Sequence, residues 1–149
     1  MLWYRLWYHM VRAILDTNIF VAALRSKQGA SFRLVQMLGA EARYRLMLSV
    51  PLVLEYEMAL KRKTSLTPPQ VEELVDYVCQ VGEHREIHFL WRPFLRDPRD
   101  EMVLEVAVES EAHFIVTHNV RDFAEVEARF GIRVVRPGAF LLELEERAL

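Results

Sequence analysis

The sequence predicts a three-layer α/β/α sandwich built on a central, mostly parallel sheet of about five strands. Short apolar runs typical of buried strands alternate along the chain with stretches whose apolar residues recur at helical spacing. Two of these strands, Val11–Leu15 and His113–Thr117, run into turns that lead to a helix. Such alternation predicts a parallel sheet with helices on both faces.

Each element is predicted from local sequence. Ser49 can cap a helix with Pro51 in its first turn, where the missing N–H of proline costs nothing. Thr67 can cap another helix, and Gly131 is a natural C-cap. The expected strands are Val11–Leu15, Tyr44–Ser49, Arg85–Phe89, His113–Thr117 and Ile132–Val135. The first expected helix follows Asp16, and the second begins near Ser31. The next three cover Leu52–Arg62, 67–82 and a stretch that includes Val103–Val108. The last two are a helix that ends at Gly131 and, after a Pro137-Gly138 turn, a helix over Phe140–Arg147.

The length of 149 residues predicts one domain with a real core, and a hydrophobic content of 52% excludes disorder. The first nine residues, MLWYRLWYH, read as a leader or disordered extension, with the domain proper at 10–149; an extra strand or interface arm is the alternative. The single cysteine, Cys79, excludes an internal disulfide and a cysteine-based zinc site, and it fits a reducing cytoplasm. No membrane segment is expected.

Aspartate is scarce, and its positions are informative. Four of the five aspartates fall at loops or helix starts near strand ends: Asp16, Asp97, Asp100 and Asp122. Acids at the carboxyl edge of one parallel sheet would converge, and converging carboxylates repel one another unless a cation neutralises them. Such a cluster suits a hard divalent metal, although Asp16 or Thr17 could also be only a helix cap.

Four motifs in order resemble the PIN domain, in the bacterial branch of toxin components related to VapC. They are LDTNIF at Leu15–Phe20, SVPLVLEYE at Ser49–Glu57, DPRDEMVLEVA at Asp97–Ala107 and VTHNVRDF at Val116–Phe123. Any one of them is a weak signal, but their order and spacing agree with the family from about Val11 to Val135.

The resemblance implies which residues form the site. Asp16, Glu55, Asp100 and Asp122 match the metal-binding and catalytic acids, with Glu57 a rival of Glu55, and with Asp97 and Glu101 neighbours of Asp100. Asn18, Thr117 and Asn119 match supporting polar positions. Asn119 stands where relatives often have aspartate. This difference lowers the negative charge of the site and leaves open whether the site holds one metal ion or two.

The resemblance also implies a Mg²⁺- or Mn²⁺-dependent endoribonuclease that hydrolyses single-stranded RNA and leaves a 5′-phosphate and a 3′-hydroxyl. Its expected partners are an RNA substrate, a cognate antitoxin and a second copy of the chain in a homodimer, in the cytoplasm. With a net charge of −2, any RNA must be held by a local patch. Arginines that flank the motifs are the candidates: Arg25, Arg99 and Arg121, with Lys27 and Arg96 beside them.

Other classes fit less well. A phosphatase with this first strand would want a second aspartate where Asn18 stands, and a phosphoacceptor domain would want a lysine late in the chain, where none follows Lys63. Glycine-rich phosphate loops are absent from the sequence. The remaining alternative is a catalytically weak module of the same fold that binds RNA or protein.

Overall fold

The computed structural model describes residues 9–39 and 42–147. The predicted leader therefore lies almost wholly outside the described residues, with the exception of His9. Within the described part, none of the helices is both long enough and apolar enough to span a membrane.

Five parallel strands form the sheet in the order β3-β2-β1-β4-β5, which confirms the predicted fold class. The central strand β1 comes first in the chain, and the strand order turns back between β1 and β4. Those two strands pair with Leu15 opposite Val116. The strands are β1 Arg12–Leu15, β2 Arg45–Leu48, β3 Glu83–His84, β4 Phe114–Val116 and β5 Arg133–Val135.

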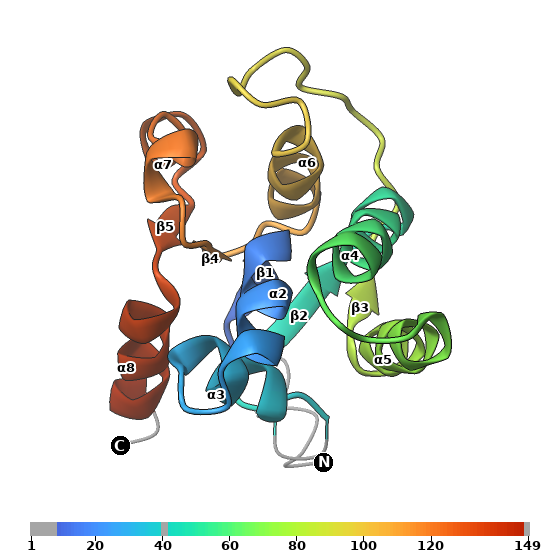
Figure 1. Ribbon diagram of the computed structural model, residues 1–149. Coiled ribbons are helices and arrows are strands. Elements are labelled where there is room, and N and C mark those ends of the chain that lie inside the picture. Colours follow the sequence, from blue (N-terminus) through green and yellow to red (C-terminus); the bar gives the residue numbers. More distant parts are fainter. Residues whose placement is uncertain (1–8, 40–41, 148–149) are drawn as a thin grey trace.

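Helices cover both faces of the sheet. Figure 1 shows α6 and α7 on one side of the sheet and α3, α5 and α8 on the other, while α2 packs against α3 and α4. A long connection of residues 85–100 leads from β3 to α6. The helices are α2 Thr17–Arg25, α3 Ala30–Gln36, α4 Val50–Lys63, α5 Pro68–Val81, α6 Glu101–Glu109, the 3₁₀ turn η1 Val120–Phe123, α7 Val126–Phe130 and α8 Pro137–Arg147.

The predicted caps are present. Ser49 Oγ accepts a hydrogen bond from the Leu52 amide at 3.3 Å, so α4 begins where the sequence indicated. Thr67 and Gln70 form a reciprocal capping box at the start of α5. Gly131 follows α7 with a φ of 69°, the left-handed conformation that favours glycine at a helix end.

Two predicted elements are wrong. The strand expected at Arg85–Phe89 lies earlier, at Glu83–His84, because the chain leaves the sheet once the Arg85 amide has bonded to the Leu48 carbonyl at 2.7 Å. The Pro137-Gly138 turn is instead the first turn of α8, since proline at a helix start has no amide hydrogen to satisfy.

The core is continuous from the sheet into both helical layers. Ala13, Ile14 and Leu15 of β1 are completely buried, as expected for a central strand covered on both faces. Phe140 of α8 packs its ring against those of Tyr44 and Phe114, at centroid distances of 5.3 and 5.0 Å. Because both faces of the central strand are packed, the position of Asp16, which directly follows the strand, is fixed.

An ion pair holds the short β3 strand to β2. The Arg45 guanidinium donates to both Glu83 carboxylate oxygens, at 2.6 and 2.8 Å, and this contact keeps the pKa of Glu83 below its usual value. The stabilisation is therefore present above the ordinary glutamate pKa and is lost as the pH falls through the lowered folded-state pKa.

We expect Glu83→Gln to lower the free energy of unfolding near neutral pH by about 1 kcal/mol, the upper end for exposed ion pairs, because this pair is bidentate and only partly exposed. The loss should shrink below about pH 4, where Glu83 of the unfolded chain takes up a proton first and folded Glu83, with its lowered pKa, follows at lower pH. Urea unfolding across this pH range measures it, with the exposed Glu86→Gln as control. A loss that is equal at every pH would contradict the assignment.

Candidate active site

The candidate site lies where β1 and β4 end side by side. Asp16 directly follows β1, and Thr117 directly follows β4. The Asp16 amide donates to the Val116 carbonyl at 2.9 Å, which continues the ladder between the strands past the last paired residues. In open parallel sheets the ligand crevice lies outside the carboxyl ends of the strands, at the point where the strand order reverses. Asp16 occupies that point.

Asp16 is buried, with 6% of its surface exposed. Its Oδ1 accepts from the Thr17 amide at 2.8 Å, and its Oδ2 accepts from the Thr117 hydroxyl at 2.7 Å. Burial raises the pKa of Asp16; the bonds from Thr117 and Thr17 lower it, and the nearby Asp122 carboxylate raises it further. Asp16 is therefore the helix cap that the sequence offered as the plain alternative, and it is also an acid held in a fixed orientation.

The predicted supporting residues surround Thr117. Its Oγ1 accepts from the Asn119 amide at 3.0 Å and from Asn18 Nδ2 at 3.5 Å. The Asn18 side-chain oxygen in turn accepts from the His118 amide at 3.4 Å. Asn18 and Thr117 thus connect the start of α2 to the turn after β4. Asn119 contributes through its backbone, and its side chain is exposed.

Asp100 stands at the N-terminus of α6, and the pKa of its carboxyl is strongly raised. Burial raises its pKa to about 7, and the charges of Asp16, Asp97 and Asp122 add to the shift. Its Oδ2 is buried and has no hydrogen-bond partner within residues 9–39 and 42–147. The Asp100 carboxylate is thus turned inward, close enough to the other three acids to feel their charge.

Asp122 lies in η1, and its side chain is exposed. Its charge acts on both Asp16 and Asp100. The amide of Asp122 bonds to the Asn119 carbonyl at 3.0 Å, which fixes the turn that carries it. Asp16, Asp100 and Asp122, far apart in the chain, therefore gather at one edge of the sheet.

The two acids on α4 differ in their surroundings. Glu57 accepts from Lys61 at 2.7 Å in a surface pair one helical turn apart. Glu55 has no such partner among the described residues, and its charge acts on Arg99, which also feels Asp100. Of the two, Glu55 is the one whose charge reaches the loop before Asp100.

The neighbours of Asp100 have other partners. Asp97 accepts from the Arg99 guanidinium, and this interaction keeps the pKa of Asp97 below its usual value. Glu101 is buried, and its Oε1 accepts from the amides of Phe94 and Leu95, both at 2.8 Å. Glu101 therefore holds the connection in place beside Asp100.

The donor set suits a hard divalent cation, since carboxylate oxygens are the ligands that Mg²⁺ and Mn²⁺ prefer. The unpartnered Asp100 oxygen and the mutual repulsion of the aspartates are the two features that a cation would relieve. In the part of the chain that the structure describes, however, no three His, Cys, Asp or Glu side chains stand close enough together to hold one ion as they are.

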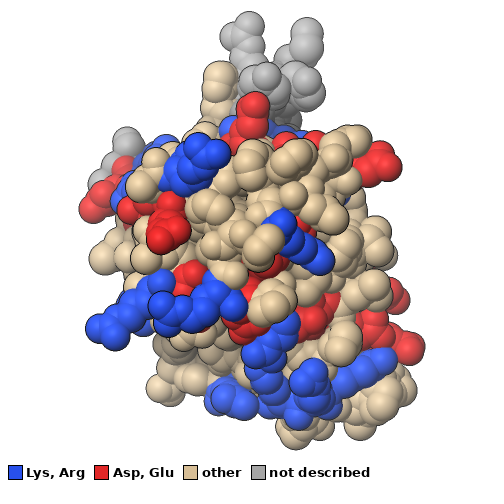
Figure 2. All heavy atoms as spheres, turned by 90° about the horizontal axis from the view of Figure 1, so that it is seen from above, with Lys and Arg blue, Asp and Glu red and all other residues tan. Residues whose placement is uncertain are grey.

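The candidate arginines are arranged unequally around these acids. Arg25 donates to the Lys63 carbonyl at 3.2 Å, and Arg99 is paired with Asp97. Arg121 is exposed and lines a pocket of about 460 Å³ together with Arg96 and Asp122. Figure 2 shows acidic side chains near the middle of one face, with basic side chains beside and below them. The face therefore offers cations around a negative centre.

Sequence reasoning missed the positioning role of Tyr56. Tyr56 is buried on α4, and its hydroxyl donates to the Leu15 carbonyl at 2.5 Å. This bond ties α4 to the residue before Asp16. Burial raises the pKa of Tyr56, and the Asp16 charge adds to the shift. A tyrosine at a core position is the signal that could have found it, since a buried hydroxyl needs a partner.

The chain is similar in sequence to one protein family and in structure to solved proteins. The chain matches the family described as PIN domain over residues 12–121. No curated protein sequence matches it. The structure of VapBC2 from Rickettsia felis, bound to a DNA fragment from its promoter, is 14% identical with a TM-score of 0.58 over 85% of this chain and 98% of that one.

VapBC-1 from nontypeable Haemophilus influenzae is 17% identical, with a TM-score of 0.60 over 86% of this chain and 99% of that one. At identities of 14% and 17%, this similarity shows that the chain has the same fold as these two structures. The family match covers most of the chain, including Asp16, Glu55, Asp100 and Thr117. This chain belongs to the PIN-domain family.

Proposed function

We propose that this protein is a metal-dependent endoribonuclease that hydrolyses phosphodiester bonds in single-stranded RNA, and that it is the toxin of a toxin-antitoxin pair. The observation that carries the proposal is the gathering of Asp16, Asp100 and Asp122 at the carboxyl edge of β1 and β4, with one Asp100 oxygen buried and unpartnered. Membership in the PIN-domain family supports a nuclease.

In this proposal Asp16, Glu55, Asp100 and Asp122 hold Mg²⁺ or Mn²⁺. When bound, the cation supplies Lewis acidity and neutralises the charge that develops on the phosphodiester. Thr117 and the Thr17 amide keep both Asp16 oxygens oriented, and Asn18 holds Thr117 in place. Arg25, Arg99 and Arg121 are proposed to contact RNA phosphates.

An antitoxin partner is proposed from the fold that this chain shares with the VapBC2 and VapBC-1 structures. Homodimer formation is proposed from the resemblance stated above, as is action in the cytoplasm. Light scattering of the purified chain tests the dimer, and a monomer at high concentration would count against it.

A catalytically weak binding module is the second candidate. It is favoured by the spacing of the acids, because no three in the described residues could hold one ion as they stand. The two candidates differ in whether a bound divalent ion leads to turnover.

The test is cleavage of an end-labelled single-stranded RNA with Mg²⁺, with Mn²⁺ and with chelator. We expect cutting only with a divalent ion, and products that carry a 5′-phosphate and a 3′-hydroxyl, because an activated water rather than the 2′-hydroxyl attacks. Products with 2′,3′-cyclic phosphates would contradict the mechanism. Absence of cutting with either ion, in folded protein free of inhibitor, would favour the binding module.

A further inference from the structure

Four aromatic rings on the long connection and α7 form a contiguous row. Phe89 packs on Trp91 with a centroid distance of 4.5 Å, Trp91 on Phe130 at 5.0 Å, and Phe130 on Phe94 at 5.3 Å. The Arg129 guanidinium lies 5.9 Å from the Phe130 ring centre. We refer to Phe89, Trp91, Phe94 and Phe130 as the aromatic row.

One end of the aromatic row is open to solvent. Phe89 is 58% exposed and the adjacent Leu90 is 60% exposed, whereas Trp91, Phe94 and Phe130 are half-buried. Single exposed apolar residues are common, but adjoining exposed apolar side chains backed by packed rings form a patch typical of binding surfaces. The core does not need the Phe89 ring.

Acids of α6 hold the connection rigidly. Glu101 binds the amides of Phe94 and Leu95, and Glu105, 3% exposed in its side chain, accepts two hydrogen bonds from Arg92 at 2.8 and 3.2 Å. One turn further on, Glu109 accepts from His88 at 2.7 Å. These acids recur every four residues and lie along one side of the helix. The aromatic row is thereby fixed relative to Asp100, which precedes Glu101.

The aromatic row is continuous with the candidate site. The pocket of about 460 Å³ has Phe94 and Leu95 on its wall together with Arg96, Arg121 and Asp122. Within residues 9–39 and 42–147, the guanidinium groups of Arg96 and Arg121 form no hydrogen bond or ion pair. Unpaired arginines at one end of a row of rings whose other end is exposed supply what single-stranded nucleic acid requires, which is cations for the phosphates and flat apolar faces for the bases.

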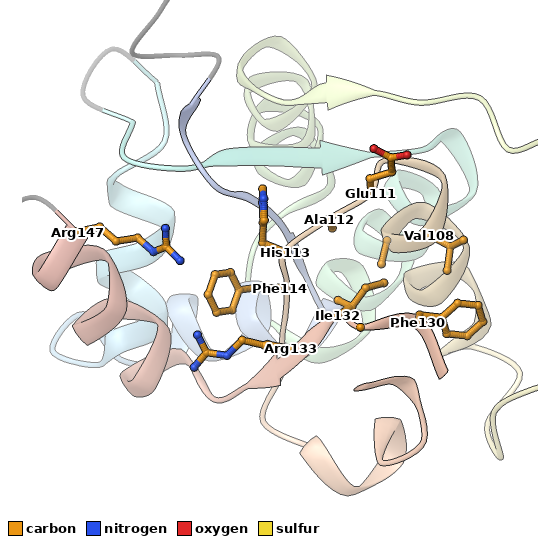
Figure 3. A pocket seen from close by; sticks show the side chains of 11 residues that line it. Val108, Glu111, Ala112, His113, Phe114, Phe130, Ile132, Arg133 and Arg147 are labelled. Carbon is orange, nitrogen blue, oxygen red and sulfur yellow. The ribbon is translucent and has the colours of Figure 1, made fainter. Parts of the chain in front are cut away.

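Another pocket, of about 440 Å³, lies at the opposite edge of the sheet and carries no such argument. His113 and Arg133 stand there at the amino ends of their strands. Figure 3 shows Phe114 between Arg133 and Arg147. Arg133 lies 4.9 Å from the Phe114 ring centre and forms an ion pair with Glu143, so these side chains cover the core.

We propose that the aromatic row is a base-stacking surface for single-stranded RNA, with Phe89 as its exposed end and with Arg96 and Arg121 binding the phosphates that lead to the acids. The inference rests on the proposed function and names how that site takes its substrate. Stacking of this kind tolerates any base sequence, because every base offers a flat face.

Tryptophan fluorescence can report directly on the row. The chain has three tryptophans, so Trp3→Phe with Trp7→Phe leaves Trp91 as the reporter. In chelator, with Asp16→Asn added to prevent cleavage, we expect a short oligoadenylate to quench Trp91. Polyphosphate of matched length carries the charge but no bases, and it should not quench.

Phe89→Ala is expected to weaken oligoadenylate binding about tenfold in the same background. Arg96→Ala should weaken both oligoadenylate and polyphosphate. The controls are Leu142→Ala, an exposed apolar residue on α8, and the exposed Arg43→Ala, neither of which should change binding. Unchanged thermal unfolding of Phe89→Ala would show that the fold is intact.

Unchanged oligoadenylate affinity in Phe89→Ala, or no binding by the parent protein, overturns the stacking surface. Metal-dependent cleavage by the wild type is measured separately, so a nuclease that keeps its activity and affinity without Phe89 would refute this inference alone. If Phe89→Ala instead weakens only the binding of an antitoxin protein, the aromatic row is a protein interface and the inference is wrong.

Discussion

Replacing Asp16 with asparagine is expected to reduce metal-dependent RNA cleavage at least about 100-fold, since losing even a group that only supports a metal ligand typically costs 10- to 100-fold. The fold should survive, because an asparagine oxygen can still accept from the Thr17 amide, and Thr117 Oγ1 can accept from the asparagine Nδ2 once its own hydroxyl hydrogen turns away. Initial rates of cleavage of a labelled RNA, with Mg²⁺ and with Mn²⁺, measure the loss.

The matched control is Asp76→Asn. Asp76 is the remaining aspartate of the chain, and it is exposed on α5, which supplies none of the candidate site residues. Its removal changes the net charge by the same amount and should leave the cleavage rate unchanged. Equal activity in the two variants would mean that Asp16 is only a cap, or that the activity belongs to a contaminant.

Asp100→Asn is expected to change stability in opposite directions with and without metal. In chelator the variant should unfold at a higher temperature than the wild type, because it removes a buried carboxylate repelled by Asp16, Asp97 and Asp122. Each kcal/mol gained raises the melting temperature of a domain of this size by about 2–4 °C. With Mg²⁺ or Mn²⁺ the wild type should gain stability that the variant lacks.

Asp97→Asn serves as the control from the same loop. Asp97 is stabilised as a carboxylate by Arg99, so its replacement removes a favourable interaction and should not raise the melting temperature in chelator. Differential scanning fluorimetry of the three proteins, with and without metal, makes the comparison. Two results would contradict a cation site at Asp100. One is a wild-type melting temperature that neither ion changes, and the other is a lower melting temperature for Asp100→Asn than for the wild type in chelator.

Most of the fold could be predicted because its signals are local. The cap at Ser49 and the capping box at Thr67 each depend on residues within one helical turn, and the structure contains both. The third strand could not be placed, because Arg85–Phe89 has strand-like composition whereas pairing with β2 is decided by the distant Arg45. Composition does not reveal which residues meet a partner elsewhere in the chain.

Some residues of the candidate site could likewise be predicted from local sequence, and others could not. Asp16 and Thr117 could be proposed from their positions after two strands, and the structure joins them. The roles of Tyr56 and Glu101 could not, because a tyrosine on an apolar face and a glutamate at a helix start have ordinary explanations. Their partners, the Leu15 carbonyl and the amides of residues 94–95, are backbone groups that leave no trace in the sequence.

The hydrogen bond between Thr117 and Asp16 joins residues 101 positions apart, because β4 is added beside the first strand late in the chain. During synthesis on the ribosome, Asp16 therefore lacks the residue that orients it until most of the chain has been made. Fragments that end before Thr117 also lack Asp122. A chain interrupted before this point therefore lacks both the residue that orients Asp16 and one of the four candidate metal-binding acids.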